Sequence, residues 1–208
     1  IGLQLGCSSD CYETELLSKI LYKLDVIEGS SINIERCQKK NLPNVRFFNS
    51  LFEEFKVIID KEKYDFIFCT YVLEHVIDVQ PILNMIKSVL NSKGFVFFVV
   101  PNCRACSRQL ALYMNLIPGL RELTENDLIH GHRRVYDRFS FNKDIEKAGF
   151  RIIQQGGIIF KILADFQLDE LIEKRVLNKS HFKGLYKLGL EYPDFCDSLY
   201  AICCLKKN

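Results

Sequence analysis

The residues best suited to chemistry lie in a short polar stretch, HGHRR, at 130–134. A histidine with a near-neutral pKa can take a proton from a hydroxyl or an amine, and arginine can hold a phosphate or carboxylate through paired hydrogen bonds. We therefore predict acid–base chemistry by His130 or His132 on a substrate that Arg133 and Arg134 bind. Residues two apart in an extended loop point opposite ways, so we expect one of the histidines to face the substrate.

A structural role is the alternative for this stretch. Its arginines could instead pin the loop through salt bridges to acids such as Asp127 and Asp137. His75 has the same two interpretations, because it is either a third catalytic residue or an imidazole packed under the following helix. The sequence leaves both open.

A glycine turn and an acid have the spacing of a nucleotide-binding site. Gly6, Cys7 and Ser8 follow an apolar run at 1–5, and a turn of small residues lets backbone N–H groups approach a ligand closely. Glu28 stands about 20 residues later, where a carboxylate can accept hydrogen bonds from both hydroxyls of a ribose.

The nine cysteines predict neither a metal site nor a disulfide framework. Cys103 and Cys106 form a CxxC pair, but a structural zinc site needs a second pair of ligands. Cys69, Cys203 and Cys204 lie in apolar runs, which is typical of buried thiols in a reducing compartment. We therefore expect a cytoplasmic protein without a metal.

Alternating apolar segments must position these residues. Strands 64–71 and 94–100 are apolar on both faces, which is typical of a parallel sheet covered by helices on both sides. The other predicted strands are 1–5, 26–29, 45–48, 151–160 (interrupted by Gly156 and Gly157) and 198–205, and the predicted helices are 12–24, 32–40, 52–61, 79–90, 103–116, 139–148 and 162–192. We expect a polar loop over 118–137.

The chain of 208 residues predicts one domain. Residues 1–102 form its cofactor-binding half, and 103–138 and 161–197 are insertions on the substrate side. Because the sequence opens inside a strand pattern, we expect the natural N-terminus to lie upstream.

Composition excludes several classes of protein. With 48% apolar and 26% charged residues the chain can bury a core, and the longest apolar run, at 95–100, is too short for a membrane span. The net charge of +2 comes from interspersed charges, which argues against a nucleic-acid partner. We expect a small-molecule partner, and the oligomeric state is left open.

At the predicted strand ends, the sequence resembles the class I S-adenosylmethionine-dependent methyltransferases. LQLGCSSD resembles the family's glycine-rich first motif, VIEGS resembles the second, and residues 64–102 resemble the fourth and fifth nearly end to end. GHRRVYDRFSF and IEKAGFRIIQQGG match the helix and strand that close such folds. The resemblance implies a Rossmann-like α/β fold: a mostly parallel central sheet, helices on both faces, and a small inserted helical cap.

The resemblance also assigns roles to residues, with S-adenosyl-L-methionine as the cofactor. It implies contact of Gly6, Cys7 and Ser8 with the methionine part, of Glu28 with the ribose, of Ser50 and Leu51 with the adenine, and of Thr70 and Tyr71 with the methyl-transfer site. Gly29 is a further cofactor-binding residue. Asn102 and Tyr136 join Arg133 and Arg134 as substrate-binding residues. Gln4 stands where the family usually has an acid, and Ser8 and Asp10 stand where it usually has glycines.

The predicted function is methyl transfer to an oxygen or nitrogen of a small acceptor. The same stretches resemble bacterial methyltransferases linked to sugars and surface polysaccharides, which implies a sugar-like or phosphorylated acceptor. Two alternatives remain open: a methyltransferase that acts on protein or RNA, and a non-catalytic binding module with the same fold.

Overall fold

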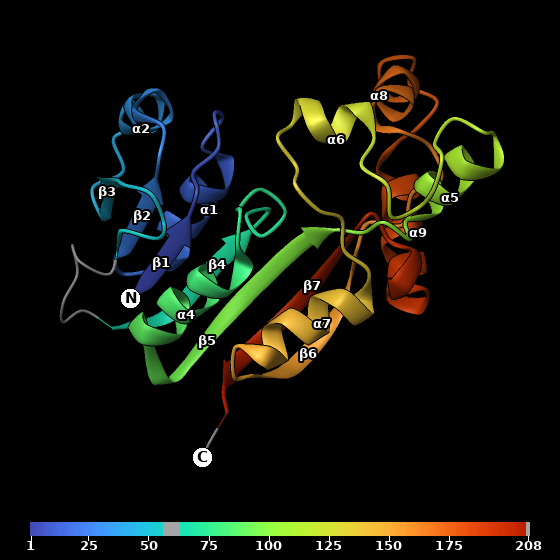
Figure 1. Cartoon of the computed structure of the whole chain (residues 1–208). Helices are drawn as coiled ribbons and strands as arrows, with labels where there is room; N and C mark the ends of the chain where they lie inside the picture. The colour runs from blue at the N-terminus through green and yellow to red at the C-terminus, as the bar shows by residue number, and fades with distance from the viewer. Residues whose placement is uncertain (56–62, 207–208) are drawn as a thin grey trace.

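The predicted sheet is present and has seven strands (Figure 1). The computed structural model describes residues 1–55 and 63–206. The strands and helices are, in chain order, β1 (Gly2–Leu5), α1 (Tyr12–Ile20), β2 (Leu24–Glu28), α2 (Ser31–Gln38), β3 (Val45–Asn49), β4 (Tyr64–Thr70), α4 (Val79–Val89), β5 (Leu90–Pro101), α5 (Cys106–Tyr113), α6 (Glu125–Ile129), α7 (Arg138–Lys147), β6 (Phe150–Ile158), α8 (Asp165–Glu173), α9 (Lys179–Glu191) and β7 (Ser198–Leu205), with a short 3₁₀ turn at Pro193–Phe195.

The strand order is β3-β2-β1-β4-β5-β7-β6. Strands β1 to β5 are parallel, and β7 runs antiparallel to both of its neighbours. The order reverses between β1 and β4, where open α/β sheets bind their ligands beyond the carboxyl ends of the strands. The predicted mostly parallel sheet with helices on both faces is confirmed.

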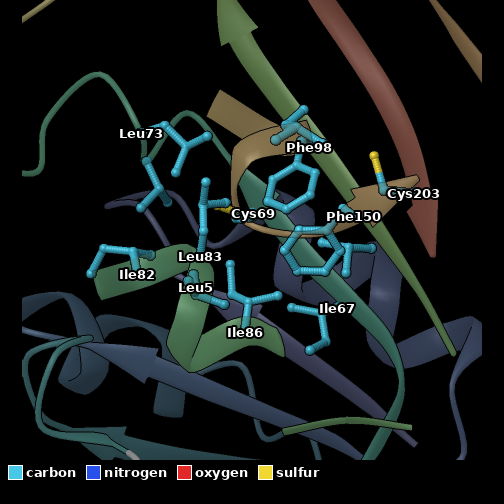
Figure 2. Packing of buried hydrophobic residues seen from close by; sticks show 14 of the residues in the cluster. Leu5, Ile67, Cys69, Leu73, Ile82, Leu83, Ile86, Phe98, Phe150 and Cys203 are labelled. Atoms are coloured by element: carbon cyan, nitrogen blue, oxygen red, sulfur yellow. The ribbon is translucent and has the colours of Figure 1, made fainter. Parts of the chain in front are cut away.

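Alternation along the strands feeds two hydrophobic cores. Leu3 and Leu5 of β1 face the larger core, which α4 and α7 cover, while Leu24 and Val26 of β2 face a smaller core beneath α1 and α2. Helix α4 buries its residues at helical spacing, and Figure 2 shows Ile86 beside Leu5 and Ile67. These cores fix the strand ends.

The two glycines near the end of β6 do not interrupt it, contrary to the prediction. A side chain on Gly156 would meet the ring of Tyr200 at 2.5 Å, and one on Gly157 would meet the carbonyl of Pro193 at 2.3 Å. The glycines therefore permit close approach of neighbouring chain segments, and the strand continues through both. Its irregularity lies between Ile152 and Gln154 instead.

The second half contains more separate helices than predicted. The expected loop over 118–137 includes α6, which a capping box of Thr124 and Asp127 starts. The expected helix over 162–192 is divided into α8 and α9, and Arg175 between them has a positive φ of 58° that no helix allows. The helix predicted over 52–61 lies largely outside the described residues.

The inserted helices gather beyond the carboxyl end of β5. Figure 1 shows α5, α6, α8 and α9 on that side, away from β1, β2 and β3. Across residues 1–55 and 63–206, no helix has the length and apolar character needed to cross a membrane.

Candidate active site

Two cavities lie at the carboxyl edge of the sheet and share Tyr71 and His75. The first, the strand-end cleft, has a volume of about 570 Å³ and is lined by Leu5, Gly6, Ser8, Asp10, Tyr12, Glu13, Glu28, Phe52 and Thr70 to Val72, with His75. The second, the insertion cavity, has a volume of about 830 Å³ and includes Glu74, Asn102, Arg108, Ala111, Asp127, His130, His132, Lys161 and Asp197 with the shared pair. Both volumes suit small ligands.

The turn after β1 leaves open space above the strand end. Gly6 has a φ of +79°, and a side chain there would meet no atom within 4 Å. Ser8 also takes a positive φ, of 52°, and its hydroxyl donates to Asp10 Oδ1 at 2.6 Å. Asp10 is exposed, and the hydrogen bonds from Ser8 and the Tyr12 amide lower its pKa. The two departures from the glycine pattern therefore support each other within one turn.

Glu28 connects the end of β2 to this turn. One carboxylate oxygen accepts the Cys7 amide at 3.0 Å, and the other accepts the Ser30 amide at 2.8 Å. The oxygen bonded to the Cys7 amide also accepts the Cys7 thiol at 3.7 Å, whereas the oxygen bonded to Ser30 can accept a further hydrogen bond. Because Glu28 lines the cleft, that oxygen can still receive a ribose hydroxyl. Cys7 itself is buried beneath the turn, where burial and Glu28 raise the pKa of its thiol to about 12.

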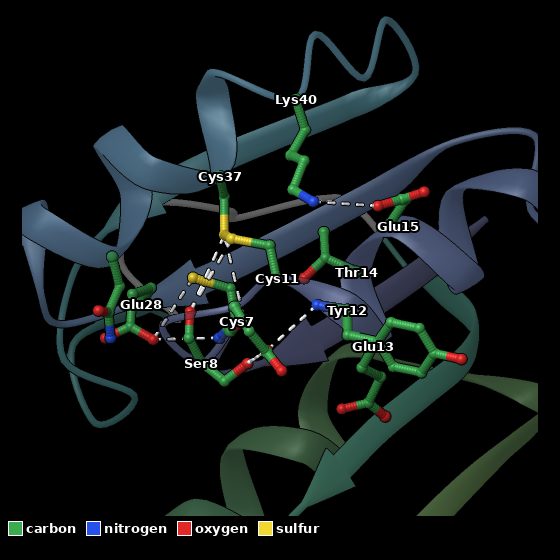
Figure 3. The surroundings of a disulfide bond; sticks show 12 residues. Cys7, Ser8, Cys11, Tyr12, Glu13, Thr14, Glu15, Glu28, Cys37 and Lys40 are labelled. Atoms are coloured by element: carbon green, nitrogen blue, oxygen red, sulfur yellow. Dashed lines mark hydrogen bonds and ion pairs between the residues drawn. A yellow bond between two sulfur atoms is a disulfide. The ribbon is translucent and has the colours of Figure 1, made fainter.

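The disulfide between Cys11 and Cys37 contradicts the expectation that the cysteines are reduced thiols (Figure 3). Cys11 begins α1 and Cys37 lies in α2, with Cα atoms 5.5 Å apart. The pairing is not evident from the sequence because 26 positions separate the two residues and only the fold brings them together. Cys69 and Cys203 are buried free thiols, as predicted, whereas Cys204 is free but only half-buried.

Glu13 is a site residue that the sequence analysis missed. It lies on α1, lines the cleft, and accepts hydrogen bonds from Thr70 Oγ1 at 2.6 Å and from Gln4 Nε2 at 3.3 Å. Gln4 is held in turn by the Thr14 hydroxyl at 2.8 Å. An acid is therefore present beside the position where the family usually has one, but it comes from the helix.

Three predicted cofactor-binding residues, Gly29, Ser50 and Leu51, lie at the carboxyl end of the strands, as expected, but they are not among the described residues that line the cleft. Among the described residues that line the cleft, the segment after β3 contributes Phe52. Ser50 donates its hydroxyl to the Leu51 carbonyl at 2.9 Å, and Gly29 packs near Leu51. These three assignments stay predictions.

Both His130 and His132 line the insertion cavity, so the expectation that one of the pair points away is wrong. Gly131 between them has a φ of +77°, which turns the chain and keeps the two rings 6.3 Å apart. Their environments differ. His132 Nδ1 lies 3.0 Å from Asp127 Oδ1, whereas the ring of the exposed His130 bonds, among the described residues, to the backbone carbonyl of Asn126.

Asp127 is ionised and fixes the tautomer of His132. Burial alone would raise the pKa of Asp127, but the amide and hydroxyl of Thr124 and the guanidinium of Arg108 bring it to about 2. A carboxylate accepts, so Nδ1 of His132 carries the proton in this contact, and in the neutral imidazole that tautomer has its lone pair on Nε2. The His132 ring packs edge-on against His75, with centroids 4.8 Å apart. Burial and the neighbouring His132 lower the pKa of His75.

Arg133 and Arg134 take the structural interpretation, although with different partners from those expected. Arg133 Nε donates to the His75 carbonyl at 3.0 Å, and Arg134 donates to the carbonyls of Leu73 and Ile77. Asp127 and Asp137 pair with Arg108 and Arg121 instead. Neither Arg133 nor Arg134 is among the described residues that line the insertion cavity.

Two further predicted substrate-binding residues are held within the protein. Tyr136 is 2% exposed and belongs to the larger core, so the assignment to substrate is wrong. Its place reflects pairing of its backbone with Asn102 beside β5. Asn102 lines the cavity, but its amide group donates to the carbonyls of Asp194 and Cys196, which fixes the start of β7.

The matching family model is described as a methyltransferase domain and covers residues 2–155, about three-quarters of the chain. The chain belongs to this methyltransferase family. Its fold is that of solved class I relatives. An S-adenosylmethionine-dependent methyltransferase from Mesorhizobium loti has a TM-score of 0.63 at 12% identity, with 97% of this chain and 89% of that chain covered.

Other solved methyltransferase structures have the same fold. The N-methyltransferase NodS from Bradyrhizobium japonicum, solved with S-adenosyl-L-homocysteine, has a TM-score of 0.60 at 13% identity over 99% of this chain and 78% of that one. The plantazolicin methyltransferase BamL, solved with a triazolic desmethylPZN analogue and S-adenosyl-L-homocysteine, has a TM-score of 0.63 at 14% identity, with 100% of this chain and 77% of that chain covered. No curated protein matches the sequence.

The methyltransferase uses S-adenosylmethionine, and the strand-end cleft fits that cofactor. Acidic Asp10, Glu13 and Glu28 line the cleft, and the described part of its wall includes no lysine or arginine. S-Adenosylmethionine carries two positive centres, an ammonium and a sulfonium, which favour an acidic surrounding. The open space above Gly6 and the acid at the end of β2 agree with the family's binding mode.

Proposed function

We propose that this methyltransferase methylates an oxygen or nitrogen of a small, hydroxyl-rich molecule bound in the insertion cavity. The observation that best supports this proposal is that Tyr71 and His75 line both cavities. A methyl donor in the cleft and an acceptor in the insertion cavity would therefore meet at these two residues. Methyl transfer mainly requires such alignment, because the sulfonium of the cofactor supplies an already activated methyl group.

In this proposal Glu28 receives the ribose hydroxyls and Glu13 receives the ammonium of the cofactor. Burial raises the pKa of Glu13, opposed by its hydrogen bonds from Thr70 and Gln4. A cation beside the carboxylate would favour its ionised form. Glu13 would thus serve the role of the acid that the first motif lacks at Gln4.

Tyr71 supports the placement of the reaction. It has a positive φ of 55°, an unfavourable conformation for a residue with a bulky side chain. Its amide donates to the Val99 carbonyl at 2.9 Å, and its hydroxyl lies 3.0 Å from Ser198 Oγ. Backbone strain of this kind concentrates at functional sites, where the surrounding structure holds it in place.

His132 is the residue we assign to activation of the acceptor. Asp127 orients its ring as carboxylates orient catalytic imidazoles, with Nδ1 toward the carboxylate. His130 lacks a carboxylate partner in the described structure. His75 takes a positioning role at the junction of the two cavities.

The cations of the insertion cavity are already compensated. Lys161 is 5% exposed and pairs with Asp165 and, at 3.0 Å, with Asp197, while Arg108 pairs with Asp127. A neutral polyol therefore suits the cavity better than a phosphorylated molecule. A sugar-like acceptor also agrees with the resemblance to enzymes of bacterial surface-polysaccharide synthesis, the cellular role we propose.

The test is a methyl-transfer assay on a panel of free sugars, amino sugars and sugar nucleotides, preceded by thermal-shift measurement with S-adenosylmethionine. We expect a cofactor-dependent rise in melting temperature and turnover on at least one neutral sugar unit. Turnover only on peptide or RNA substrates, run in parallel, would contradict the proposal. Cofactor binding without turnover on any substrate class would favour the non-catalytic alternative.

A further inference from the structure

We propose that Glu74, His75 and His132 form a binding site for a divalent transition-metal ion in the insertion cavity. The inference rests on the proposed function only for the position of the acceptor. This proposal differs from the expectation from sequence that the protein has no metal. The sequence does not reveal the cluster, because Glu74 and His75 are far from His132 in the chain and the fold brings them together.

The three side chains offer a suitable donor set. One nitrogen of each histidine and one oxygen of Glu74 lie within 4.8 Å of one another. Bonds from zinc to nitrogen or oxygen are about 2.0–2.2 Å long, so two ligands on one tetrahedral ion lie about 3.3–3.6 Å apart. Side-chain rotations that move the donors by about 1–1.5 Å would bring them to bonding distance.

Glu74 provides the independent observation that points to a ligand. It is 1% exposed and lines the cavity, yet neither of its carboxylate oxygens accepts a hydrogen bond from any described residue. A buried carboxylate without a partner is costly, and a bound cation satisfies both its charge and its lone pairs.

The surrounding chain holds the three residues in place. The Arg133 amide donates to the Glu74 carbonyl at 2.8 Å, and its side chain donates to the His75 carbonyl. Arg134 donates to the carbonyls of Leu73 and Ile77 on either side. The two arginines thereby lock the loop of Glu74 and His75 onto the loop of His132.

Asp127 completes the arrangement behind His132. A metal-bound histidine usually donates its other ring N–H to a carboxylate or carbonyl, which fixes its tautomer. The contact of 3.0 Å between His132 Nδ1 and Asp127 Oδ1 supplies this support and leaves Nε2 for the ion. Asp127 is thus a positioning residue in this proposal.

The ion would act as a Lewis acid on the acceptor. Three protein ligands leave coordination positions open for a hydroxyl or water, as in catalytic sites with two histidines and one carboxylate. Coordination lowers the pKa of the bound hydroxyl; its proton leaves to solvent, and the oxygen remains as an alkoxide on the ion. The activation assigned to His132 is then exerted through the metal it binds.

The test is titration of metal-stripped protein with Co²⁺ alone, followed by its visible d–d absorption, without cofactor or acceptor. Cobalt reports its ligands, so thiolate coordination by the free cysteines is distinguishable by intense charge-transfer bands. We expect one equivalent bound through nitrogen and oxygen. Glu74→Gln and His132→Ala should each weaken binding by about 100-fold or more, and Asp127→Asn by about 10–100-fold.

Matched controls come from elsewhere on the surface. His181→Ala on α9 and Glu146→Gln on α7 remove the same side-chain types at exposed positions and should leave cobalt binding unchanged. Circular dichroism verifies folding, and Glu74→Gln preserves the shape of the side chain. No saturable binding by the wild type, or equal binding by Glu74→Gln and the wild type, would overturn the proposal.

Cofactor binding and turnover, measured on the same samples, separate this inference from the proposed function. Binding of S-adenosylmethionine and turnover in the presence of a chelator, together with absence of cobalt binding, would overturn the metal site alone. Cobalt binding through the three residues, without turnover on any small acceptor, would support the site and contradict the proposed function.

Discussion

The two cavities that meet at Tyr71 and His75 are built in different ways. The strand-end cleft comes from residues directly after β1, β2 and β4, and acids with backbone turns form much of its wall. The insertion cavity draws on the ends of β4 and β5 but mainly on α5, α6 and the segments around α8. The cleft is thus a product of the sheet, while the insertion cavity depends on segments that differ from one such fold to another.

The two cavities also differ in how their charged side chains are compensated. Acids of the cleft have no cation beside them in the described wall, whereas acids and cations of the insertion cavity compensate one another. The exception is Glu74, which has no hydrogen-bond partner in the described structure. This difference is the basis on which the proposed function assigns the cationic cofactor to the cleft and a neutral acceptor to the insertion cavity.

Replacement of His132 should have the largest effect, and it should affect one cavity only. His132→Ala is expected to lower kcat by about 10²–10⁴-fold, because the group that activates the acceptor is lost. Calorimetry should show unchanged affinity for S-adenosylmethionine, since His132 does not line the described wall of the cleft. His130→Ala is the matched control and should retain most of the rate. Near wild-type turnover by both variants would place activation elsewhere.

Loss of the disulfide between Cys11 and Cys37 should affect the strand-end cleft and the stability of the chain. The double variant Cys11→Ala, Cys37→Ala is expected to lower the free energy of unfolding by about 3 kcal/mol, because the bond closes a loop of moderate length. Urea denaturation measures this change. Cofactor affinity should also fall, since Cys11 ends the turn that carries Ser8 and Asp10. Cys204→Ala removes a free, half-buried thiol as the control. A stability equal to that of the control would show that the disulfide contributes nothing.

Glu28→Ala should produce a smaller effect, again confined to the cleft. Loss of a charge-assisted acceptor for the ribose hydroxyls is expected to weaken cofactor binding by about 1.5–3 kcal/mol, measured by calorimetry. The Cys7 and Ser30 amides lose their acceptor too, so Glu28→Gln is the informative companion: it keeps an oxygen for one of them. Unchanged affinity in Glu28→Ala would place the cofactor elsewhere.

The sequence predicts the cleft better than the insertion cavity for a physical reason. Gly6 and Glu28 are evident because a strand, a tight turn and a second strand fix their separation. Glu13 is missed because an acid in the first turn of a helix is usually a solvated residue, and only its bonds to Gln4 and Thr70 show that it turns inward. Even in the cleft, therefore, the contact between Glu13 and Thr70 depends on the tertiary fold and cannot be predicted from local sequence.

Prediction around the insertion cavity fails where the chain turns. The single positive φ at Gly131 brings His130 and His132 to the same side, which spacing alone cannot indicate. Arg133 bonds to backbone carbonyls of a loop that is distant in sequence, so no local pattern separates this role from phosphate binding. Tyr136 packs its ring against Phe141 and pairs its backbone with Asn102, and the second of these contacts is distant in the sequence.

The proposed assignment of the cofactor to the cleft and of the acceptor to the insertion cavity can be tested by filling the insertion cavity. Ala111 of α5 lines the insertion cavity, and Ala111→Trp would place an indole in the space assigned to the acceptor. The neighbouring exposed Leu110, outside the described cavity wall, gives the control Leu110→Trp. We predict that Ala111→Trp binds S-adenosylmethionine with wild-type affinity in calorimetry but loses turnover, whereas the control keeps both. Wild-type turnover by Ala111→Trp would contradict the assignment of the acceptor to the insertion cavity.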